Sequence, residues 1–385
     1  MERRTIVNDV ELCGPEGLAS FAWPEGTDYE RAFLTPLMKD GARPHVANIE
    51  TRMMLLRAGS IVMPVTINDR EYDNSYVCSP YTAVISYPLE ELGKLNSRAL
   101  RGALKSLIHV MSPLVRGGGI NRVVSVNNWL LSTNLYPAWN GGHLDRLTEL
   151  LVAQFPDKAI MFRSLNRATN DELYQAFAKA GYVLAPSRQV YLFDGVRPDY
   201  LRRPNTRWDQ KLLKNSPYTE VNHDGLTEND DAEIVRLYDL LYLKKYSYHN
   251  PQFTSRLVGL WRRERLLELF ALRSPEGRLD GVVGCFSRNR VMTAPMVGYD
   301  TMLPQKLGLY RMLMAIVLRE AARQNMTLNL SSGAAGFKRL RGGEPHIEYS
   351  AIFYAHLPWQ RRAIWRTLSL LLTQIGARVL KKYEL

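Results

Sequence analysis

The segment Leu303-Pro304-Gln305-Lys306-Leu307-Gly308-Leu309-Tyr310 decides the predicted fold, because it forms a glycine-containing turn that opens a helix. Apolar residues follow at the i, i+4, i+7, i+8 spacing of one helix face: Leu309, Leu313, Ile316 and Val317. The first backbone N–H groups of a helix have no partner within the helix, so the turn suits an anion such as a pyrophosphate. The alternative is that Gly308 only permits close helix packing.

Strands and helices alternate on both sides of this turn. In the second half we expect helices at 228–245 and 252–263, strands at 267–273 and 279–286, and a strand at about 292–303 that leads into the turn. The first half repeats the plan, with strands at 60–67, 121–126, 159–165 and 189–193 and helices at 92–114, 143–156 and 170–180. The order predicts an α/β (α+β) protein with two units in tandem, each a mixed twisted sheet flanked by helices.

Length and composition favour a globular protein with two cores. The chain has 385 residues, of which 46% are hydrophobic. Its three cysteines, Cys13, Cys78 and Cys285, lie far apart without metal-ligand spacing, so we expect free thiols and no metal. The first residues show no apolar stretch typical of a secretory signal, and no run of eighteen apolar residues predicts a transmembrane helix. We therefore expect a cytoplasmic protein.

The net charge of +12 fits three kinds of anionic partner: nucleic acid, a membrane surface or an acidic cofactor. Basic residues gather at 202–214, 262–265 and 361–382, but none of these clusters is a run of five like charges. No zinc-finger or RNA-binding aromatic motif accompanies them. Solvated helix faces explain such charges equally simply.

Several motifs together resemble the GNAT acyltransferase superfamily, and more narrowly its two-domain branch of cellulose-biosynthesis-type acetyltransferases and Fem aminoacyl transferases. They are Gly298-Tyr299-Asp300, the Leu-Pro-x-x-Leu-Gly turn, Ala321-Ala322-Arg323, Leu328-Asn329-Leu330-Ser331-Ser332-Gly333 and Gly336-Phe337-Lys338-Arg339-Leu340-Arg341-Gly342. The resemblance implies an N-terminal extension at 1–45, a GNAT-like domain at 46–196, a connecting segment at 197–224, a GNAT domain at 225–357 and an amphipathic helix at 358–385.

The resemblance implies coenzyme A or an acyl-CoA as co-substrate, held by the end of the fourth strand and the turn. The residues that we expect there are Met302, Leu303, Gln305, Leu307, Gly308, Leu309 and Tyr310. Lys338 and Arg341 could offer cations to phosphate or to a substrate carboxylate. Tyr310 departs from the superfamily, which has a small residue at this place, and the two-domain relatives that use aminoacyl-tRNA combine a weak turn with another donor.

Acyl transfer to an amine needs a base for the nucleophile and an acid for the leaving group. The family layout makes Asp300 the candidate base, although a helix-turn cap or an ion pair with Lys306 or Lys338 would explain it as well. The superfamily often uses a tyrosine as acid, but Phe337 stands near that position. Tyr299 and Tyr349 are the candidate substitutes, with packing as the alternative role.

Polar residues at strand ends of the first half indicate a second binding region, because ligands of open α/β sheets lie at strand ends. The candidate substrate-binding residues there are Asn127, Asn128, Ser132, Asn134, Tyr136, Arg163, Asn166 and Arg188. Turn-capping asparagines and locally paired arginines are the alternative. The loop at 246–253 adds Tyr246, Tyr248 and Asn250 as acceptor-side candidates.

The favoured function is transfer of an acyl group from an acyl-thioester to an amine of a small polar substrate, such as an amino acid or an intermediate of natural-product biosynthesis. A carrier protein or charged tRNA could replace acyl-CoA as donor, which would make the protein an aminoacyl transferase. A ligand-binding protein that kept the fold and lost catalysis is the third hypothesis. The basic C-terminal helix either packs on the sheet, which we favour, or lies on an anionic membrane.

Overall fold

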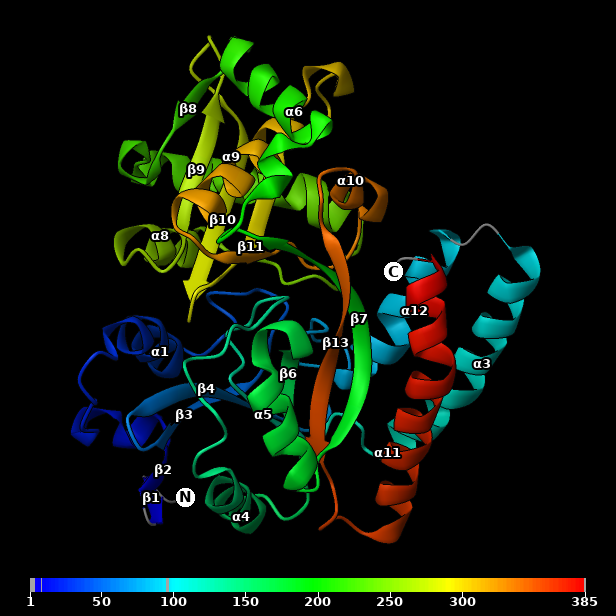
Figure 1. Cartoon of the computed structure of the whole chain (residues 1–385). Helices are drawn as coiled ribbons and strands as arrows, with labels where there is room; N and C mark the ends of the chain where they lie inside the picture. The colour runs from blue at the N-terminus through cyan, green and yellow to red at the C-terminus, as the bar shows by residue number, and fades with distance from the viewer. Residues whose placement is uncertain (1–3, 8, 95–96, 384–385) are drawn as a thin grey trace. The chain divides into compact units, whose positions relative to one another are not determined.

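The computed structural model describes residues 4–7, 9–94 and 97–383 (Figure 1). Residues 1–3 of the predicted N-terminal extension and 384–385 of the predicted C-terminal helix lie outside this range. The chain divides into two compact units. Unit 1 comprises residues 1–188, 249–251 and 347–383, and unit 2 comprises residues 189–248 and 252–346.

The sheet of unit 1 is antiparallel except for one parallel pair. Its strands, in spatial order, are β1 (Arg4–Val7), β2 (Val10–Cys13), β3 (Arg52–Ala58), β4 (Ile61–Asn68), β5 (Val123–Val126), β6 (Ala159–Asn166) and the end of β13 (Glu344–Phe353). The parallel pair is β5 with β6, in which Val123 lies opposite Ala159. Apolar residues from β2 to β6 pack with α4 (Leu144–Gln154) and α5 (Arg167–Lys179) to form one core.

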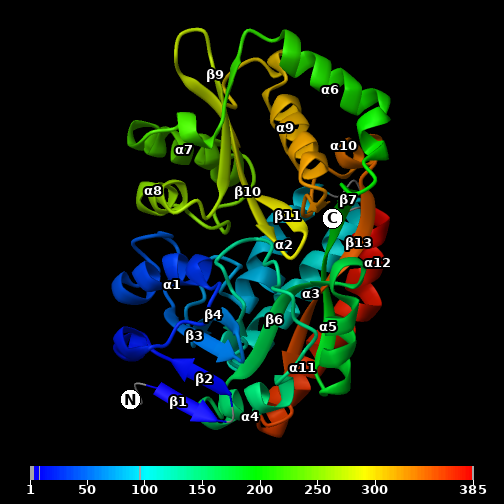
Figure 2. The same cartoon turned by 60° about the vertical axis from the view of Figure 1, so that its left-hand side comes forward.

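Further helices complete unit 1. They are α1 (Asp28–Asp40), which lies against β3 and β4 (Figure 2), α2 (Tyr87–Glu91), α3 (Arg98–Gly117), α11 (Trp359–Leu371) and α12 (Ala377–Tyr383). Helix α3 begins at Ser97, whose hydroxyl accepts a hydrogen bond from the Leu100 amide. Trp365 and Leu368 of α11 are buried with Met111 and Val115 of α3 and with sheet residues such as Met161. The first half of the apolar stripe of the predicted tail helix is therefore packed within unit 1, whereas Ile375 near its end is 39% exposed.

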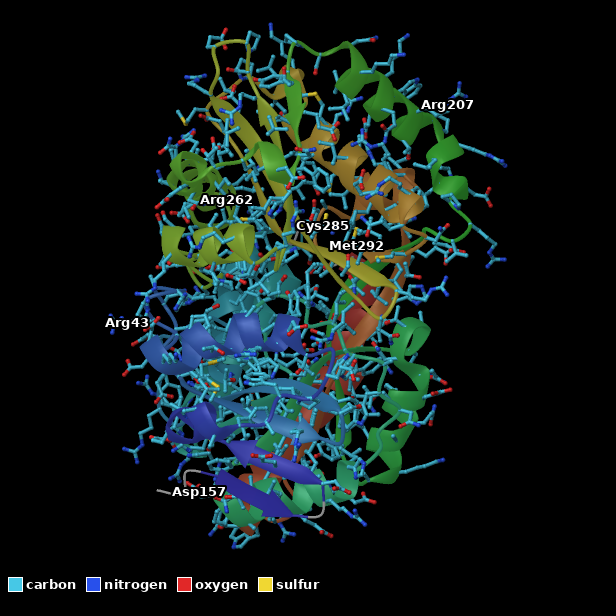
Figure 3. The ribbon with its side chains drawn as sticks, turned by 90° about the vertical axis from the view of Figure 1, so that its left-hand side faces the viewer. Arg43, Asp157, Arg207, Arg262, Cys285 and Met292 are labelled. Atoms are coloured by element: carbon cyan, nitrogen blue, oxygen red, sulfur yellow. The ribbon has the colours of Figure 1, made fainter. Side chains whose placement is uncertain are left out.

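The sheet of unit 2 also contains one parallel pair. Its strands, in spatial order, are the end of β7 (Val183–Asp194), β12 (Thr327–Asn329), β11 (Val291–Tyr299), β10 (Leu279–Arg288), β9 (Glu268–Arg273) and β8 (Thr219–Val221). The parallel pair is β11 with β12. Cys285 of β10 and Met292 of β11 both belong to the core of this unit (Figure 3).

Helices cover both faces of this sheet. Gly281 and Gly298 occupy neighbouring positions of the β10–β11 pair, so they face opposite sides. A Cβ atom on Gly281 would contact Leu313 of α9 (Leu309–Arg323), whereas one on Gly298 would overlap the backbone of Tyr238 in α7 (Asp231–Tyr238). Helix α6 (Pro204–Asn215) packs on α9, α8 (Ser255–Arg263) packs on α7, and α10 (Ala335–Leu340) follows β12.

Each sheet is completed by a strand from the other half of the chain. In unit 1 the order β4, β5, β6, β13 ends on a strand from the second half, which pairs antiparallel with β6. In unit 2 the order β10, β11, β12, β7 ends on a strand from the first half, which pairs antiparallel with β12. The two sheets share this pattern, with the parallel pair in the same place. The predicted mixed α/β fold in two similar units is confirmed.

Candidate active site

A divergence of two strands opens the candidate site in unit 2. Strands β11 and β12 pair only from Val291 with Thr327 to Thr293 with Asn329. Strand β11 continues to Tyr299, whereas β12 ends at Asn329. A shift of register between β10 and β11 lies opposite this point, and such bulges increase the local twist of a strand. The edge of β11 beyond Thr293 therefore has no pairing strand within the described residues.

The turn after β11 begins earlier than the sequence predicted. The strand ends at Tyr299 rather than near Leu303, because Oδ1 of Asp300 accepts a hydrogen bond from the Met302 amide at 2.9 Å. The Leu307 amide bonds to the Pro304 carbonyl and the Gly308 amide to that of Gln305, both at 3.0 Å. Met302 is 83% exposed in this turn, so it lies beyond the strand edge on which it was expected.

Gly308 sets the direction of helix α9. Its φ of 71° and ψ of 30° are left-handed, a conformation that glycine adopts without strain. A Cβ atom here would also lie 2.6 Å from Cδ2 of Leu212 in α6. Both observations make glycine specific to this turn, where it allows close packing on α6 and caps helix α9. Its contact with the donor stays a prediction.

The first turn of α9 presents unbonded amides. The Met312 amide is the first that bonds back, to the Gly308 carbonyl at 3.0 Å. The amides of Leu309, Tyr310 and Arg311 make no hydrogen bond with any described residue. They lie at the positive end of the helix dipole, which is where proteins bind phosphate groups.

Tyr310 lies at this helix start with its ring between two aromatic residues. Its ring centroid is 4.9 Å from that of Phe337 and 6.1 Å from that of Tyr299. Burial raises the pKa of the Tyr310 hydroxyl well above its usual value, so the group is a neutral phenol at physiological pH. Of the other predicted donor residues, Leu303 and Leu307 are half-buried, Leu309 is buried and Gln305 is exposed.

Lys338 and Arg341 have partners other than a phosphate. The ammonium of Lys338 donates to the carbonyls of Leu330, Ser331 and Ser332 at 2.7, 3.1 and 2.7 Å, which uses all three of its N–H groups. Arg341 is buried, pairs with Asp209 of α6 and lies over the Phe337 ring. Both cations hold the segment between β12 and α10 in place, so the structure gives them a supporting role instead of the predicted contact with phosphate.

Asp300 forms an ion pair at the end of β11. Its Oδ2 lies 3.0 Å from Nη2 of Arg236, on α7. Burial raises the pKa of this carboxyl, but hydrogen bonds from the Met302 amide and from Arg236 outweigh burial and hold its pKa below the usual value. Asp300 is thus an ionised carboxylate with low affinity for a proton, which is a poor starting point for the predicted base.

The two predicted acids lie in different units. The Tyr299 hydroxyl accepts a hydrogen bond of 3.3 Å from the Lys245 ammonium, which also lies 5.9 Å from the centre of the Tyr299 ring. Tyr349 belongs to the part of β13 in unit 1, where its ring centroid is 5.2 Å from that of Tyr174. Tyr299 is therefore the one of the two that lies in the unit of β11 and α9.

Asp239 is a candidate that sequence reasoning missed. It begins a π-helical turn, Asp239–Lys244, that follows α7 and contacts β11. Its Oδ1 is buried without a hydrogen-bond partner, and burial raises the pKa of the carboxyl to about 6, against the smaller opposing effect of Lys244. Such π-helical turns are frequent at functional sites, but nothing in the local sequence marks this one.

The predicted substrate residues of the first half form a polar network inside unit 1. Asn127 bonds to the Leu135 carbonyl and to Trp129 Nε1, and Asn128 bonds to Thr66 and to the Val77 carbonyl. The Tyr136 hydroxyl donates to the Arg163 carbonyl, and Asn166 caps α5 by accepting from the Ala168 amide. These bonds hold the loop after β5, as expected if the asparagines are structural.

Two arginines extend this network. Arg163 donates to the carbonyls of Val77 and Ser132, and Arg188 donates to the Ser132 carbonyl, to Thr133 and to the buried Glu348. Burial lowers the pKa of Arg163, which nevertheless stays a cation. Asn134 Nδ2 and Glu348 Oε2 are buried without a hydrogen-bond partner in the described chain. The network gathers the predicted residues, although most of their donors are already used.

The loop at 246–253 is divided between the units. Tyr246 and Tyr248 belong to unit 2 and are exposed. Asn250 belongs to unit 1, is buried, and accepts a hydrogen bond from Asn48 through its carbonyl. The three predicted acceptor-side residues are thus shared between the two units.

The described part of the chain contains neither a metal-ligand cluster nor a helix that could span a membrane. No cluster of three or more histidine, cysteine, aspartate or glutamate residues in this part of the chain is arranged to hold a metal ion. None of the described helices has the length and apolar character needed to cross a membrane.

Comparison with protein families gives one match. Residues 205–339 match the profile of a family described as acetyltransferase (GNAT) domain. No curated protein sequence matches the chain.

Solved structures show fold-level similarity. L-PGS from Bacillus licheniformis is 14% identical over 59% of this chain and 77% of its own, with a TM-score of 0.42. FemX is 9% identical over 59% and 78%, with a TM-score of 0.43. A tandem GNAT protein from the clavulanic acid biosynthesis pathway is 11% identical over 87% and 91%, with a TM-score of 0.38.

Proposed function

From the GNAT acyltransferase domain that this chain carries, we propose that it transfers an acyl group from acyl-CoA to an amine of a small polar substrate. The proposal rests on one observation, namely that two features occur together in unit 2. Strands β11 and β12 pair over only three residue pairs, and the unbonded amides open helix α9, which packs against β11.

The donor fits these two features by its chemistry. The pyrophosphate of coenzyme A accepts hydrogen bonds from the amides of Leu309, Tyr310 and Arg311. The extended amide-containing arm of coenzyme A pairs with the open edge of β11, as a peptide pairs with the edge of a sheet. Gly308 keeps the helix start close to that edge, and Lys306 of the same turn is an exposed cation.

Asp239 is our proposed general base. The amine must lose a proton before or as it attacks the thioester carbonyl, and the best base has a pKa near the working pH. Asp239 has a pKa of about 6 and a carboxyl oxygen without a partner, on a segment that contacts β11. Asp300 instead holds the turn through the Met302 amide and Arg236.

Tyr299 is our proposed proton donor. When the tetrahedral intermediate collapses, the C–S bond breaks and the thiolate of coenzyme A takes up a proton. Tyr299 ends β11, and its hydroxyl is hydrogen-bonded to the Lys245 ammonium, which would stabilise the phenolate that forms when the hydroxyl gives its proton to the thiolate. A Tyr299→Phe variant keeps the ring and should lower kcat more than it changes KM.

Calorimetric titration of the full chain with acetyl-CoA tests the donor. We expect one saturable site whose affinity falls by about tenfold in Gly308→Ala, the loss expected for roughly one charge-assisted hydrogen bond. Gly336→Ala is the matched control, because a Cβ atom there contacts nothing within 4 Å. Failure of the wild-type chain to bind any coenzyme A derivative would refute the donor assignment.

Aminoacyl transfer from charged tRNA is the second candidate. Tyr310 is the observation that favours it, because its ring occupies the place of a small residue beside the anion-binding amides. The net charge of +12 also suits a nucleic acid. A salt series separates the donors: binding to a phosphate backbone should weaken steeply with salt, whereas binding of one coenzyme A should weaken little.

A further inference from the structure

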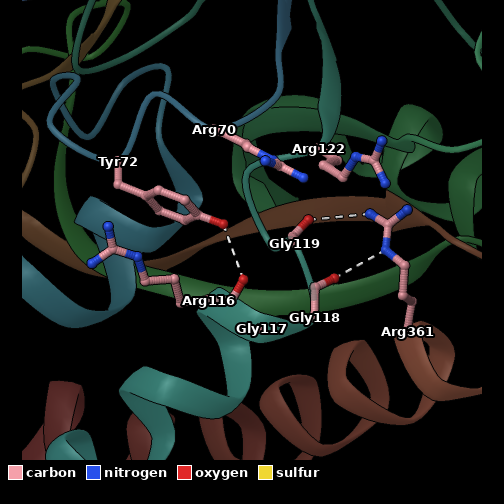
Figure 4. A pocket seen from close by; sticks show the side chains of 8 residues that line it. All are labelled: Arg70, Tyr72, Arg116, Gly117, Gly118, Gly119, Arg122 and Arg361. Carbon is pink, nitrogen blue, oxygen red and sulfur yellow. Dashed lines mark hydrogen bonds between the residues drawn. The ribbon is translucent and has the colours of Figure 1, made fainter.

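Unit 1 contains a cavity of about 460 Å³ whose lining is basic (Figure 4). The residues around it are Arg70, Tyr72, Arg116, Gly117, Gly118, Gly119, Arg122 and Arg361. We propose that this cavity binds a phosphate group, carried either by a soluble compound or by a lipid headgroup. The site is independent of the proposed donor site, since every lining residue belongs to unit 1.

The turn after α3 shapes one wall. The Gly118 amide bonds to the Leu114 carbonyl at 2.9 Å and the Gly119 amide to the Arg116 carbonyl at 3.0 Å. Gly119 has a φ of 64°, and a Cβ atom on Gly118 would lie 2.1 Å from Cδ1 of Ile364. The glycines therefore let helix α11 approach closely enough to bring Arg361 to the cavity.

Arg361 is fixed by backbone carbonyls and not by an acid. Its Nε donates to the Gly118 carbonyl at 3.0 Å and its Nη2 to the Gly119 carbonyl at 3.1 Å (Figure 4). Its Nη1 donates to the Asp157 carbonyl. Burial and the nearby Arg122 lower the pKa of Arg361. The guanidinium thus lies beside another positive charge without a carboxylate partner among the described residues.

The other cations leave the cavity with excess positive charge. Arg122 pairs with Asp157 at 2.8 Å and lies 3.7 Å from Asp69, and its Nε is buried without a hydrogen-bond partner. Arg116 lies over the Tyr72 ring, 4.7 Å from its centre. Neither Arg116 nor the exposed Arg70 has a carboxylate partner within the described chain. With Arg361, three of the four guanidinium groups thus form no direct ion pair there, although the charges of Asp157 and Asp69 offset part of the positive charge at Arg361.

Phosphate is the ligand that matches this arrangement. A guanidinium offers paired N–H groups in a planar fork, and a phosphate offers oxygens at the matching spacing. Arginines that converge on one cavity repel one another, so an anion between them lowers the energy of the site as well as forming hydrogen bonds. A carboxylate ligand has fewer oxygens to share among four guanidinium groups.

Calorimetric titration of the full chain with pyrophosphate at low salt tests the site. Arg70→Ala/Arg116→Ala removes two cations that make no ion pair within the described chain, and we expect its affinity to fall by at least about tenfold. Arg43→Ala is the matched control, because Arg43 is an exposed arginine of unit 1 outside the cavity (Figure 3). It should bind as the wild type does.

Thermal unfolding checks that Arg70→Ala/Arg116→Ala is folded. The variant Arg70→Lys/Arg116→Lys should bind pyrophosphate better than the alanine variant, because it restores the two positive charges. Pyrophosphate can also bind the amides of α9, so binding that persists unchanged in Arg70→Ala/Arg116→Ala would overturn the proposal. Absence of any pyrophosphate or inorganic phosphate binding by the wild type would overturn it as well.

Vesicle cosedimentation identifies the source of the phosphate. Vesicles of phosphatidylcholine alone are compared with vesicles that also contain phosphatidylglycerol. Binding to the anionic vesicles that is lost in Arg70→Ala/Arg116→Ala and kept in Arg43→Ala assigns a lipid headgroup. Pyrophosphate binding with the same dependence, but without vesicle binding, assigns a soluble phosphate compound. Vesicle binding that both variants retain equally would place membrane contact elsewhere and contradict a lipid role for the cavity.

Discussion

Nη2 of Arg236 lies 3.0 Å from Oδ2 of Asp300, while Oδ1 of Asp300 accepts a hydrogen bond from the Met302 amide at 2.9 Å. One carboxylate thus joins helix α7 to the turn that leads toward α9. The same contacts hold its pKa below the usual value, against the opposing effect of burial. Asp300 is better suited to position the turn than to accept a proton.

Substitution of Asp300 separates these two roles. Asp300→Asn keeps an oxygen that accepts from the Met302 amide, so we expect kcat/KM to fall by less than about tenfold, whereas loss of a general base costs roughly 10²-fold or more. Asp300→Ala removes the acceptor and should raise KM for the donor further than Asp300→Asn does. Steady-state kinetics measures both, and a 10²-fold loss of kcat in Asp300→Asn at unchanged KM would restore Asp300 as the base.

Asp239→Asn should remove the base. We expect kcat/KM to fall by about 10²-fold or more, because an amide cannot accept the proton of the amine. In the wild type, kcat/KM should rise with pH through about 6 and then level off, as the Asp239 carboxyl loses its proton. A wild-type profile that is flat between pH 5 and 8, or an Asp239→Asn variant of normal activity, would contradict the assignment.

The raised pKa of Asp239 should also make the stability of the protein depend on pH, which can be tested without an activity assay. Burial raises its pKa from 3.8 to about 6, so between these values the folded chain binds more protons than the unfolded chain. The stability that protonated Asp239 contributes is complete below pH 3.8 and is lost as the pH rises through 6. Chemical denaturation measures the free energy of unfolding of Asp239→Asn and of the wild type at pH 4.5 and at pH 7.5. The difference in favour of Asp239→Asn should be larger at pH 7.5.

Gly308→Ala should lower stability by about 1 kcal/mol or more, because a left-handed conformation costs roughly that much for a residue with a Cβ atom. The overlap with Leu212 adds to this cost. Gly336→Ala, within helix α10, should instead be neutral or stabilising by about 0.5–1 kcal/mol. Urea denaturation compares the two variants, and equal stability would show that the turn is not constrained as described.

Asp209 forms two ion pairs with a fully buried carboxylate in unit 2. Its side chain is 0% exposed and contacts Arg311 at 2.6 Å as well as the buried Arg341. Asp209→Ala should lower stability by about 3–5 kcal/mol, because it leaves a buried guanidinium uncompensated. Asp199→Ala breaks the exposed pair with Arg202 and should cost less than about 1 kcal/mol. A similar loss of stability in Asp209→Ala and Asp199→Ala would show that the Asp209 ion pairs are not buried as described.

The cysteines should not react in the native protein. Cys13, Cys78 and Cys285 are buried and form no disulfide in the described chain, and burial raises the pKa of Cys78 and of Cys285 to about 12. The reactive thiolate is therefore scarce at pH 8. A thiol-specific chromogenic reagent should modify no cysteine in the native chain and three in denaturant. Rapid labelling of native protein would show that one of these sites opens.

The sequence predicted the parts of the fold that leave a local pattern. The apolar face of α9 is an example, since Leu309, Leu313, Ile316 and Val317 are all buried. The strand β3 was missed, because Arg52–Ala58 is apolar on both faces and shows no alternation. The exchange of β7 and β13 was missed for another reason: their partners lie more than a hundred residues away in sequence, and such pairing leaves no local signal.

Only part of the site could be predicted, because only its local features leave a pattern in the sequence. Gly308 and the start of α9 could be found, because a turn and a helix N-terminus are local features. The three carbonyls around Lys338 could not, since they depend on how the loop after β12 folds. The raised pKa of Asp239 comes from burial, which its neighbours in sequence do not determine.

Native mass spectrometry of the full chain against acetyl-CoA, longer acyl-CoAs and charged tRNA tests the central claim most directly. The account predicts one retained acyl-CoA per chain, weakened in Gly308→Ala and unchanged in Gly336→Ala. Retention of charged tRNA without any coenzyme A derivative would contradict it and assign an aminoacyl donor instead.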